Sequence, residues 1–402
     1  RTALELESGE MRQEWLEFCI ESQREAGAWM NARLQELGCK SFVGQYNLNG
    51  IRYYNDIRSE QSDIVFRNTY FCHPSKISRL GAITRQRSAI ESFVSYFTDV
   101  ASCRLSDRPL IITEYNHARN RYEYEQLLFP AYAALQGFSG LTMHEVDMRP
   151  EWRAYDDFST YLDRMTDYLS FFLFQKGYVK PSPNLVELVI PKSSLYGSDT
   201  DNAINTEQAR WSLFTRFAVR YENTGRPAMV AAFAPPEPLL RMPLIGYSEV
   251  MSAAQFSETG AIQGEKFDPA PLIAALRKKG VIPQGNRTDP AKGIWESDTG
   301  ELLLNGPRKR FLLRARRVEA TSFEANHDIP LPVLNRVRSS VPSTVALVSL
   351  DGKELAKDSK RMLLFYLTDN VNTGMELSPD RSILRRPGKA PTLLRTGQLE
   401  LQ

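Results

Sequence analysis

The first 178 residues alternate short apolar runs with longer stretches in which apolar residues recur at helical spacing. The spacing predicts strands at 3–6, 40–47, 62–71, 109–114 and 138–144, and helices at 11–37, 89–101, 123–137 and 158–175. Such alternation is typical of parallel strands joined by crossover helices. Five strands are too few to close an eight-stranded barrel, and an open doubly wound sheet would need a Gly-rich first turn that is missing here. We therefore predict that residues 1–178 form the later, C-terminal part of a (β/α)8 TIM barrel.

Beyond residue 180 the pattern changes to short β-rich runs, many prolines and frequent turn signals. "IWES" and "ELLLN" flank the turn at Asp298-Thr299-Gly300, and "TVALVSL" and "ELA" flank the turn at Asp351-Gly352, as in β-hairpins. Helical patterns interrupt this region at 206–222 and 271–280. We predict that residues 179–402 form an antiparallel β-sandwich domain with helical insertions, connected to the first domain by an exposed joint at 178–184.

Charge and composition narrow the class of ligand. Lys+Arg number 50 and Asp+Glu number 48, which gives a formal net charge of +2 with the two signs interspersed. No field favours nucleic acid, and the apolar stretches are too short to span a membrane. The four cysteines show no CxxC spacing, so no metal site is predicted and no cofactor is expected. A small neutral ligand or a polymeric ligand fits this balance of charges better.

One glutamate interrupts an apolar run in a place where catalysts are common. Leu110-Ile111-Ile112 leads to Glu114, and in parallel barrels the reactive groups lie at the carboxyl ends of the strands. Glu7, Asn47, His73 and His144 follow other predicted strands in the same way. A retaining glycosidase needs two carboxyl groups about 5 to 5.5 Å apart. Glu114 and Glu7 are the predicted catalytic pair.

Several longer segments resemble the retaining glycoside hydrolases of clan A, in particular the large cellulase-like proteins that carry a β-sandwich after the barrel. The resemblance spans most of the chain. It lies in "RPLIITEYNHARNRY" (108–122), "PAYAALQGFSGL" (130–141), "DIVFRNTYFCHPS" (63–75), "VALVSLDGKELAKDSKRMLLFYLTDNVNTGME" (345–376) and "GKAPTLL" (388–394).

The resemblance implies a role for both carboxylates. Glu114 corresponds to the nucleophile at the end of the seventh barrel strand. The acid/base of the clan ends the fourth strand in an Asn-Glu pair, whereas Glu7 follows Leu6, and Glu10 is an alternative to Glu7. In the family, this asparagine normally holds the sugar 2-hydroxyl. Because it is missing here, a catalytically impaired relative of these enzymes is the alternative hypothesis.

Five further residues are predicted to contact the substrate. Tyr70 and His73 fall on the sixth strand of the family, where a tyrosine and a histidine line the sugar site. Asn47 and His144 end other predicted strands, and Trp152 offers an aromatic face that suits the apolar side of a pyranose.

These observations lead to two hypotheses about function. The first is a retaining β-glycosidase that hydrolyses a β-linked oligo- or polysaccharide by double displacement. The second is a carbohydrate-binding or scaffolding relative that has lost its acid/base. The expected partner is a carbohydrate in both cases. A missing N-terminal segment or a second chain is expected to complete the barrel, because an open edge at the strand of Glu7 would leave backbone groups unpaired.

Overall fold

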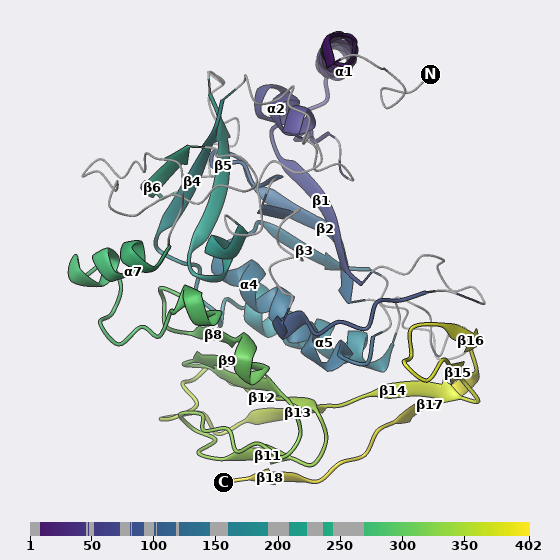
Figure 1. The fold of residues 1–402 in the computed structure, drawn as a ribbon, viewed down its shortest axis with the longest axis vertical. Coiled ribbons are helices and arrows are strands. Elements are labelled where there is room, and N and C mark those ends of the chain that lie inside the picture. The colour runs from purple at the N-terminus through teal and green to yellow at the C-terminus, as the bar shows by residue number, and fades with distance from the viewer. Residues whose placement is uncertain are drawn as a thin grey trace.

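The first half of the chain contains a small parallel sheet (Figure 1). The computed structural model describes residues 9–45, 47, 52–72, 81, 83–91, 100–101, 103–117, 120–144, 160–191, 209–222, 236–243 and 269–402. Strands β1 (Val65–Phe71), β2 (Leu110–His117) and β3 (Gly140–Met143) pair in parallel in the order β1-β2-β3. β1 and β3 lie within segments that the sequence predicts as strands, and β2 begins within the strand predicted over 109–114 but continues to His117. Most residues of β1 and β2 are buried, as is usual for parallel strands that helices cover, whereas in β3 only Met143 is buried.

A second parallel sheet comes from a later part of the chain. Strands β4 (Leu185–Ile190), β5 (Arg216–Tyr221) and β6 (Pro238–Pro243) pair in the order β5-β4-β6. A parallel bridge between Leu105 and Val219 connects β5 to the segment that precedes β2. The 3-10 helix η5 (Arg210–Leu213) leads into β5.

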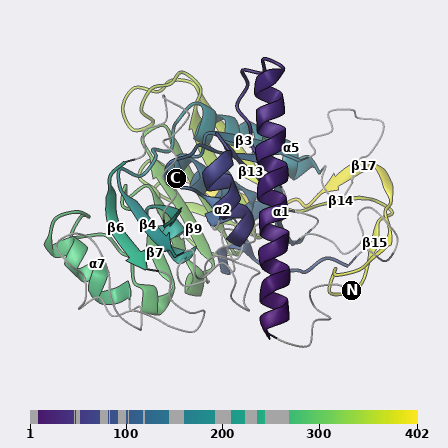
Figure 2. The same cartoon turned by 90° about the horizontal axis from the view of Figure 1, so that it is seen from above.

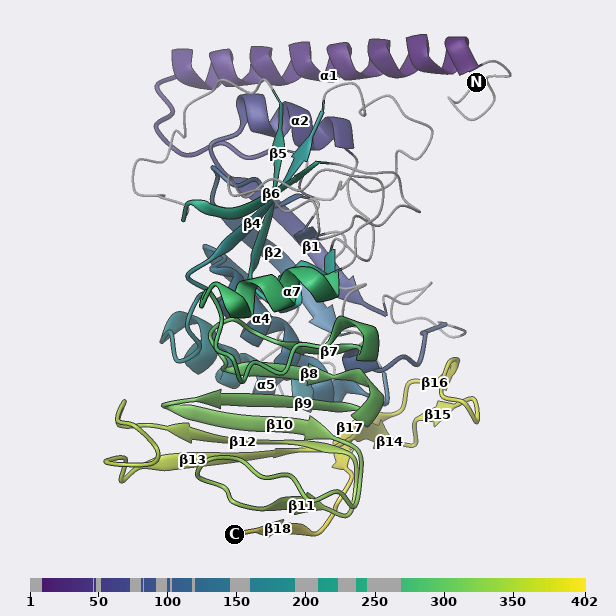
Figure 3. The same cartoon turned by 60° about the vertical axis from the view of Figure 1, so that its left-hand side comes forward.

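A helical layer lies between the parallel strands and a large antiparallel sheet (Figures 1 and 3). It contains the 3-10 helix η2 (Glu123–Leu127), α4 (Leu128–Gln136), α5 (Tyr161–Ser170) and the π-helix η3 (Phe171–Gln175). Every residue of α4 is buried, which is the pattern of a helix covered on both sides. The helix ends at Gly137, whose φ of +62° suits the left-handed C-cap.

The antiparallel sheet has the order β13-β12-β10-β9-β8-β7. Its strands are β7 (Ile294–Glu296), β8 (Leu302–Asn305), β9 (Arg310–Ala315), β10 (Val318–Phe323), β12 (Ser343–Ser349) and β13 (Met362–Leu367). One hydrophobic core runs from the parallel strands through α4 to this sheet, and the 5.9 Å contact between the Tyr132 and Phe311 rings is part of it. A smaller core including Leu303, Phe323 and Val337 also packs against the sheet.

Short ladders complete the C-terminal part. Strand β11 (Val337–Ser339) pairs with β18 (Leu399–Leu401), β14 (Asn370–Thr373) with β17 (Lys389–Leu394), and β15 (Glu376–Leu377) with β16 (Leu384–Arg386). We call residues 369–395 the arm. An antiparallel bridge between Ile83 and Ile383 ties the arm to the segment after β1. The arm thus lies toward the carboxyl ends of β1 and β2 (Figures 1 and 3).

A long helix, α1 (Gly9–Glu36), lies across the end of the molecule beside α2 (Arg52–Gln61), as Figures 2 and 3 show. It agrees with the helix predicted over 11–37. Arg24 connects the two helices, because its guanidinium lies 3.1 Å from Asp56 and 2.8 Å from Glu60. No helix within the described residues is both long and apolar enough to cross a membrane.

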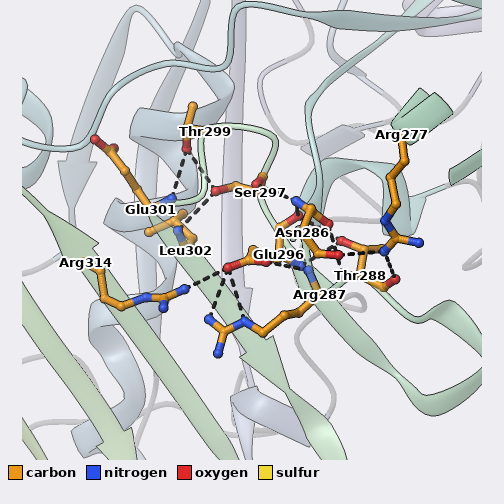
Figure 4. A network of polar contacts seen from close by, with 10 residues as sticks. All are labelled: Arg277, Asn286, Arg287, Thr288, Glu296, Ser297, Thr299, Glu301, Leu302 and Arg314. Atoms are coloured by element: carbon orange, nitrogen blue, oxygen red, sulfur yellow. Dashed lines mark hydrogen bonds and ion pairs between the residues drawn. The ribbon is translucent and has the colours of Figure 1, made fainter. Parts of the chain in front are cut away.

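A polar network fixes α7 (Pro269–Lys278) and the segment after it to the antiparallel sheet (Figure 4). Glu296 of β7 is buried and lies 3.1 Å from Nη2 of Arg287 and 2.7 Å from Nη2 of Arg314. Arg277 of α7 donates to the backbone carbonyls of Asn286 and Thr288. Because the side chains of Glu296, Arg277 and Arg314 each have partners within the fold, we interpret this network as structural.

The fold class predicted from the sequence is wrong. The described residues contain no eight-stranded parallel barrel; their parallel strands form two groups of three. The described residues of 40–47 join no ladder, although the Val43 carbonyl accepts a bond from Asp63 N at 2.8 Å. The region 179–402 is also no purely antiparallel sandwich, because β4, β5 and β6 are parallel.

The predicted joint at 178–184 is only partly exposed. Tyr178, Val179 and Ser182 are buried, and Lys180 N donates to Glu301 Oε2 at 2.8 Å. The Tyr178 hydroxyl donates to the Ser349 carbonyl at 3.1 Å. The two sides of the joint therefore share packing and hydrogen bonds.

Candidate functional site

Glu114 lies on a β-bulge near the carboxyl end of β2. The register with β1 pairs Arg67 with Ile112 but Asn68 with Glu114, so Thr113 is an extra residue. The ladder with β3 shifts at the same place, between Ile112 and Tyr115. A bulge bends its strand and re-aims the side chains beside it, and bulges are frequent next to active sites. This irregularity sets the direction of the Glu114 carboxylate.

Side chains from three neighbouring strand ends meet at this carboxylate. The Tyr70 hydroxyl, from β1, donates a short hydrogen bond to Glu114 Oε2. His144, directly after β3, places Nδ1 3.8 Å from the same oxygen. The rings of Tyr70 and His144 are 6.0 Å apart and almost perpendicular, at 82°. We call Tyr70, Glu114 and His144 the Glu114 site.

The Glu114 site remains open to solvent. The side chain of Glu114 is 35% exposed and that of His144 is 32% exposed. A carboxylate that is oriented by a hydroxyl donor and still reachable from solvent can act as a nucleophile or accept a hydrogen bond from a ligand hydroxyl.

Asn116 holds the segment after β3 against β2. Its Nδ2 donates to the His144 carbonyl, and its Oδ1 accepts from His117 N at 2.6 Å. The backbone N of His144 donates to the Tyr115 carbonyl at 3.0 Å. These bonds fix the backbone of His144 and so limit where its imidazole can lie.

Asn47 contacts Thr113, the residue directly before Glu114. Its Oδ1 lies 2.9 Å from Thr113 Oγ1, and Asn68 Oδ1 lies 2.6 Å from the same hydroxyl. A hydroxyl has one proton and can donate to only one of these oxygens, so one amide must present its NH2 group instead. Asn47 thus supports the bulge residue Thr113 and not Glu114 itself.

His117 is a core residue. It ends β2, is buried, and lies edge-on to Phe71 with ring centroids 4.7 Å apart. Burial lowers the pKa of His117 to about 3, so its imidazole is neutral at physiological pH.

The structure brings together part of the predicted set. Glu114, Tyr70 and His144 meet, and Asn47 lies beside them through Thr113. Glu7, His73 and Trp152 lie outside the described residues. Thr113, Asn68 and Asn116 also belong to the site but were not predicted from the sequence. The signal that the sequence offered for them was their position: Thr113 and Asn116 lie close to Glu114 in β2, and Asn68 lies opposite Glu114 in β1. Within the described part of the chain, no group of three or more His, Cys, Asp or Glu side chains could hold a metal ion.

Comparison with protein-family models, with curated proteins and with solved structures gave no match.

Proposed function

We propose that this chain is a retaining β-glycosidase that acts on a β-linked oligo- or polysaccharide, with Glu114 as the nucleophile. The observation that supports this most is the contact of Tyr70 and His144 with one oxygen of a solvent-accessible glutamate at a strand end. The resemblance of the segments around Tyr70 and Glu114 to clan A glycosidases gives the reaction class.

The proposed reaction has two displacements. A Glu114 oxygen attacks the anomeric carbon, the bond from that carbon to the leaving oxygen breaks, and a covalent glycosyl ester forms. The leaving oxygen takes up a proton from a general acid as this bond breaks. Water then attacks the same carbon and gives up a proton to the conjugate base of that acid, and the Glu114 carboxylate leaves. Tyr70 stabilises the ionised carboxylate before attack and between cycles, and it fixes which oxygen of Glu114 faces the substrate.

Glu114 is the only residue to which the proposal gives a catalytic role. Glu7 was predicted as the acid/base because barrel closure would bring it opposite Glu114. The fold that required this arrangement is not observed, and Glu7 lies outside the described residues. The proton donor is therefore left unassigned.

The alternative function is carbohydrate binding without turnover. Leu6 favours it, because the related enzymes carry an asparagine before the acid/base. In that case Glu114 would accept hydrogen bonds from sugar hydroxyls, and sugar would bind without being hydrolysed.

Replacing Glu114 by Gln tests the proposal, because the change removes the nucleophile at almost constant volume. Glu222→Gln is the matched control: Glu222 is an exposed glutamate directly after parallel strand β5. With a panel of aryl β-glycosides, Glu114→Gln should lower kcat by roughly a thousandfold or more, and Glu222→Gln should leave it unchanged. Near-native turnover by Glu114→Gln would exclude the proposal. Sugar binding without any turnover by the unmodified protein would favour the alternative.

A further inference from the structure

A groove rich in arginine lies between the segment after β2 and the arm. It has a volume of about 390 Å³, within the range of small-molecule sites. Arg121 and Tyr122, which lie four and five residues beyond the end of β2, line it together with Arg381 and Arg395 of the arm. The carboxylates in the lining are Asp369 and Glu324.

The charges in the groove do not cancel. Arg381 forms a forked pair with Asp369, in which one of its two bonds measures 3.1 Å, so these two charges compensate each other. Glu324 lies 3.9 Å from Lys309 Nζ. Arg121 and Arg395 form no ion pair with any described residue. The groove thus carries two guanidinium groups without a carboxylate partner.

The walls of the groove are fixed before any ligand binds. Asn370 Nδ2 donates to the buried Glu123 Oε2 at 3.1 Å, which ties the arm to η2. Arg395 N donates to the Asp369 carbonyl at 2.8 Å. The guanidinium of Arg121 lies 5.0 Å from the Tyr122 ring centroid and donates to the Tyr122 hydroxyl at 3.1 Å. These bonds hold the backbone of the arm and the guanidinium of Arg121, whereas the side chain of Arg395 is exposed. Guanidinium groups bind planar or tetrahedral oxyanions through paired N–H donors.

We infer that this groove binds a sugar unit that carries a carboxylate or a sulfate group, so that the substrate of the Glu114 site is an acidic saccharide. The inference rests on the proposed function for its sugar part. Arg121 and Arg395 would hold the oxyanion, and Tyr122 would pack against the apolar face of the ring. Glu114 lies near the carboxyl end of β2, and Arg121 and Tyr122 of the groove follow the end of the same strand by four and five residues, so we expect one extended saccharide to contact both.

Calorimetric titration of the full chain tests the inference. The probes are glucuronate, glucose 6-sulfate, glucose and inorganic sulfate, at low ionic strength. The two acidic sugars should bind more tightly than glucose. The double variant Arg121→Gln/Arg395→Gln should weaken their binding roughly tenfold or more, and Arg395→Lys alone should weaken it less because the charge remains. Arg361→Gln is the control, since Arg361 is an exposed arginine outside the groove lining.

Two outcomes would overturn the inference: equal affinity for glucose and the acidic sugars, or an affinity for acidic sugars that the double variant leaves unchanged. Binding of inorganic sulfate without either acidic sugar would overturn the assignment to a saccharide. None of these depends on Glu114. Glu114→Gln should keep the binding of acidic sugars, so its loss of turnover tests the proposed function separately.

Discussion

At the scale of single residues, the hydroxyl of Tyr70 is the most specific feature of the Glu114 site. Tyr70→Phe removes its hydrogen bond to Glu114 and keeps the ring beside His144. Without this donor the carboxylate is no longer fixed in the orientation needed for attack, so kcat should fall by roughly ten- to a hundredfold.

Tyr366→Phe is the matched control for this prediction. Its hydroxyl lies 2.8 Å from Ser339 Oγ in the C-terminal part of the chain. Steady-state kinetics of both variants checks the prediction. An equal effect of the two changes would show that a lost hydroxyl acts through the fold and not through Glu114.

Glu125 makes stability depend on pH. It is buried, and burial raises its pKa to about 8 although Ser88 and the backbone of Ile90 donate to it. Between an unfolded-state pKa near 4.5 and about 8, the folded chain keeps a proton that the unfolded chain loses. The free energy of unfolding should therefore fall as pH rises through this window, by an amount on the order of 4 kcal/mol from this group.

Denaturant unfolding at pH 5, 6.5 and 8 measures this dependence. Glu125→Gln should flatten the fall, because glutamine carries no charge to bury, whereas the exposed Glu222→Gln should not. The same slope in the unmodified chain and in Glu125→Gln would contradict the account.

Glu114 could be predicted from the sequence because a carboxylate after three apolar residues is conspicuous. The contacts that the supporting residues make could not be predicted. Asn68 reaches Thr113 only because the bulge shifts the register between β1 and β2, and a sequence does not show such a shift. Asn116 likewise acts through the carbonyl of His144, which directly follows another strand, β3.

At the scale of elements, the left-handed turn at Gly137 ends the buried helix α4. Gly137→Ala would force a residue with a Cβ to a φ of +62°, and this Cβ would lie 3.4 Å from the Arg216 guanidinium. We expect the free energy of unfolding to fall by about 1 to 2 kcal/mol. Gly285→Ala is the control, because no atom lies within 4 Å of its added Cβ. Thermal or denaturant unfolding compares the two, and equal losses would contradict the role given to the αL cap.

Elements with strong local patterns could be predicted, and those decided by distant contacts could not. The periodicity of α1 and the apolar runs of β1 and β2 suffice for their assignment. Residues 206–222 were predicted as a helix, but β5 occupies 216–221 because it pairs along its whole length with β4. The partner predicted for β12 was "ELA" (354–356), whereas β13 starts later, at Met362. Pairing with β4 outweighed the helical pattern at 216–221, whereas β12 does pair with the next strand but across a longer connection than predicted.

At the scale of the whole molecule, the barrel prediction failed because alternation of strands and helices does not specify how many strands close together. The described parallel strands form two small sheets, and one comes from the region predicted to be antiparallel. The boundary between residues 178 and 179 stays a prediction. Hydrogen bonds from Tyr178 and Lys180 to the antiparallel sheet region give both sides of it a shared stability.

The proposed mechanism requires a covalent bond between Glu114 and the sugar, and this bond can be detected directly. Incubation with a 2-deoxy-2-fluoro aryl glycoside of a sugar that the protein hydrolyses would slow the second displacement and leave the ester intact. Mass spectrometry of the intact chain and of its peptides should then show one added glycosyl group, located on Glu114. A label on another residue, or turnover of the parent substrate while no label forms, would contradict the claim.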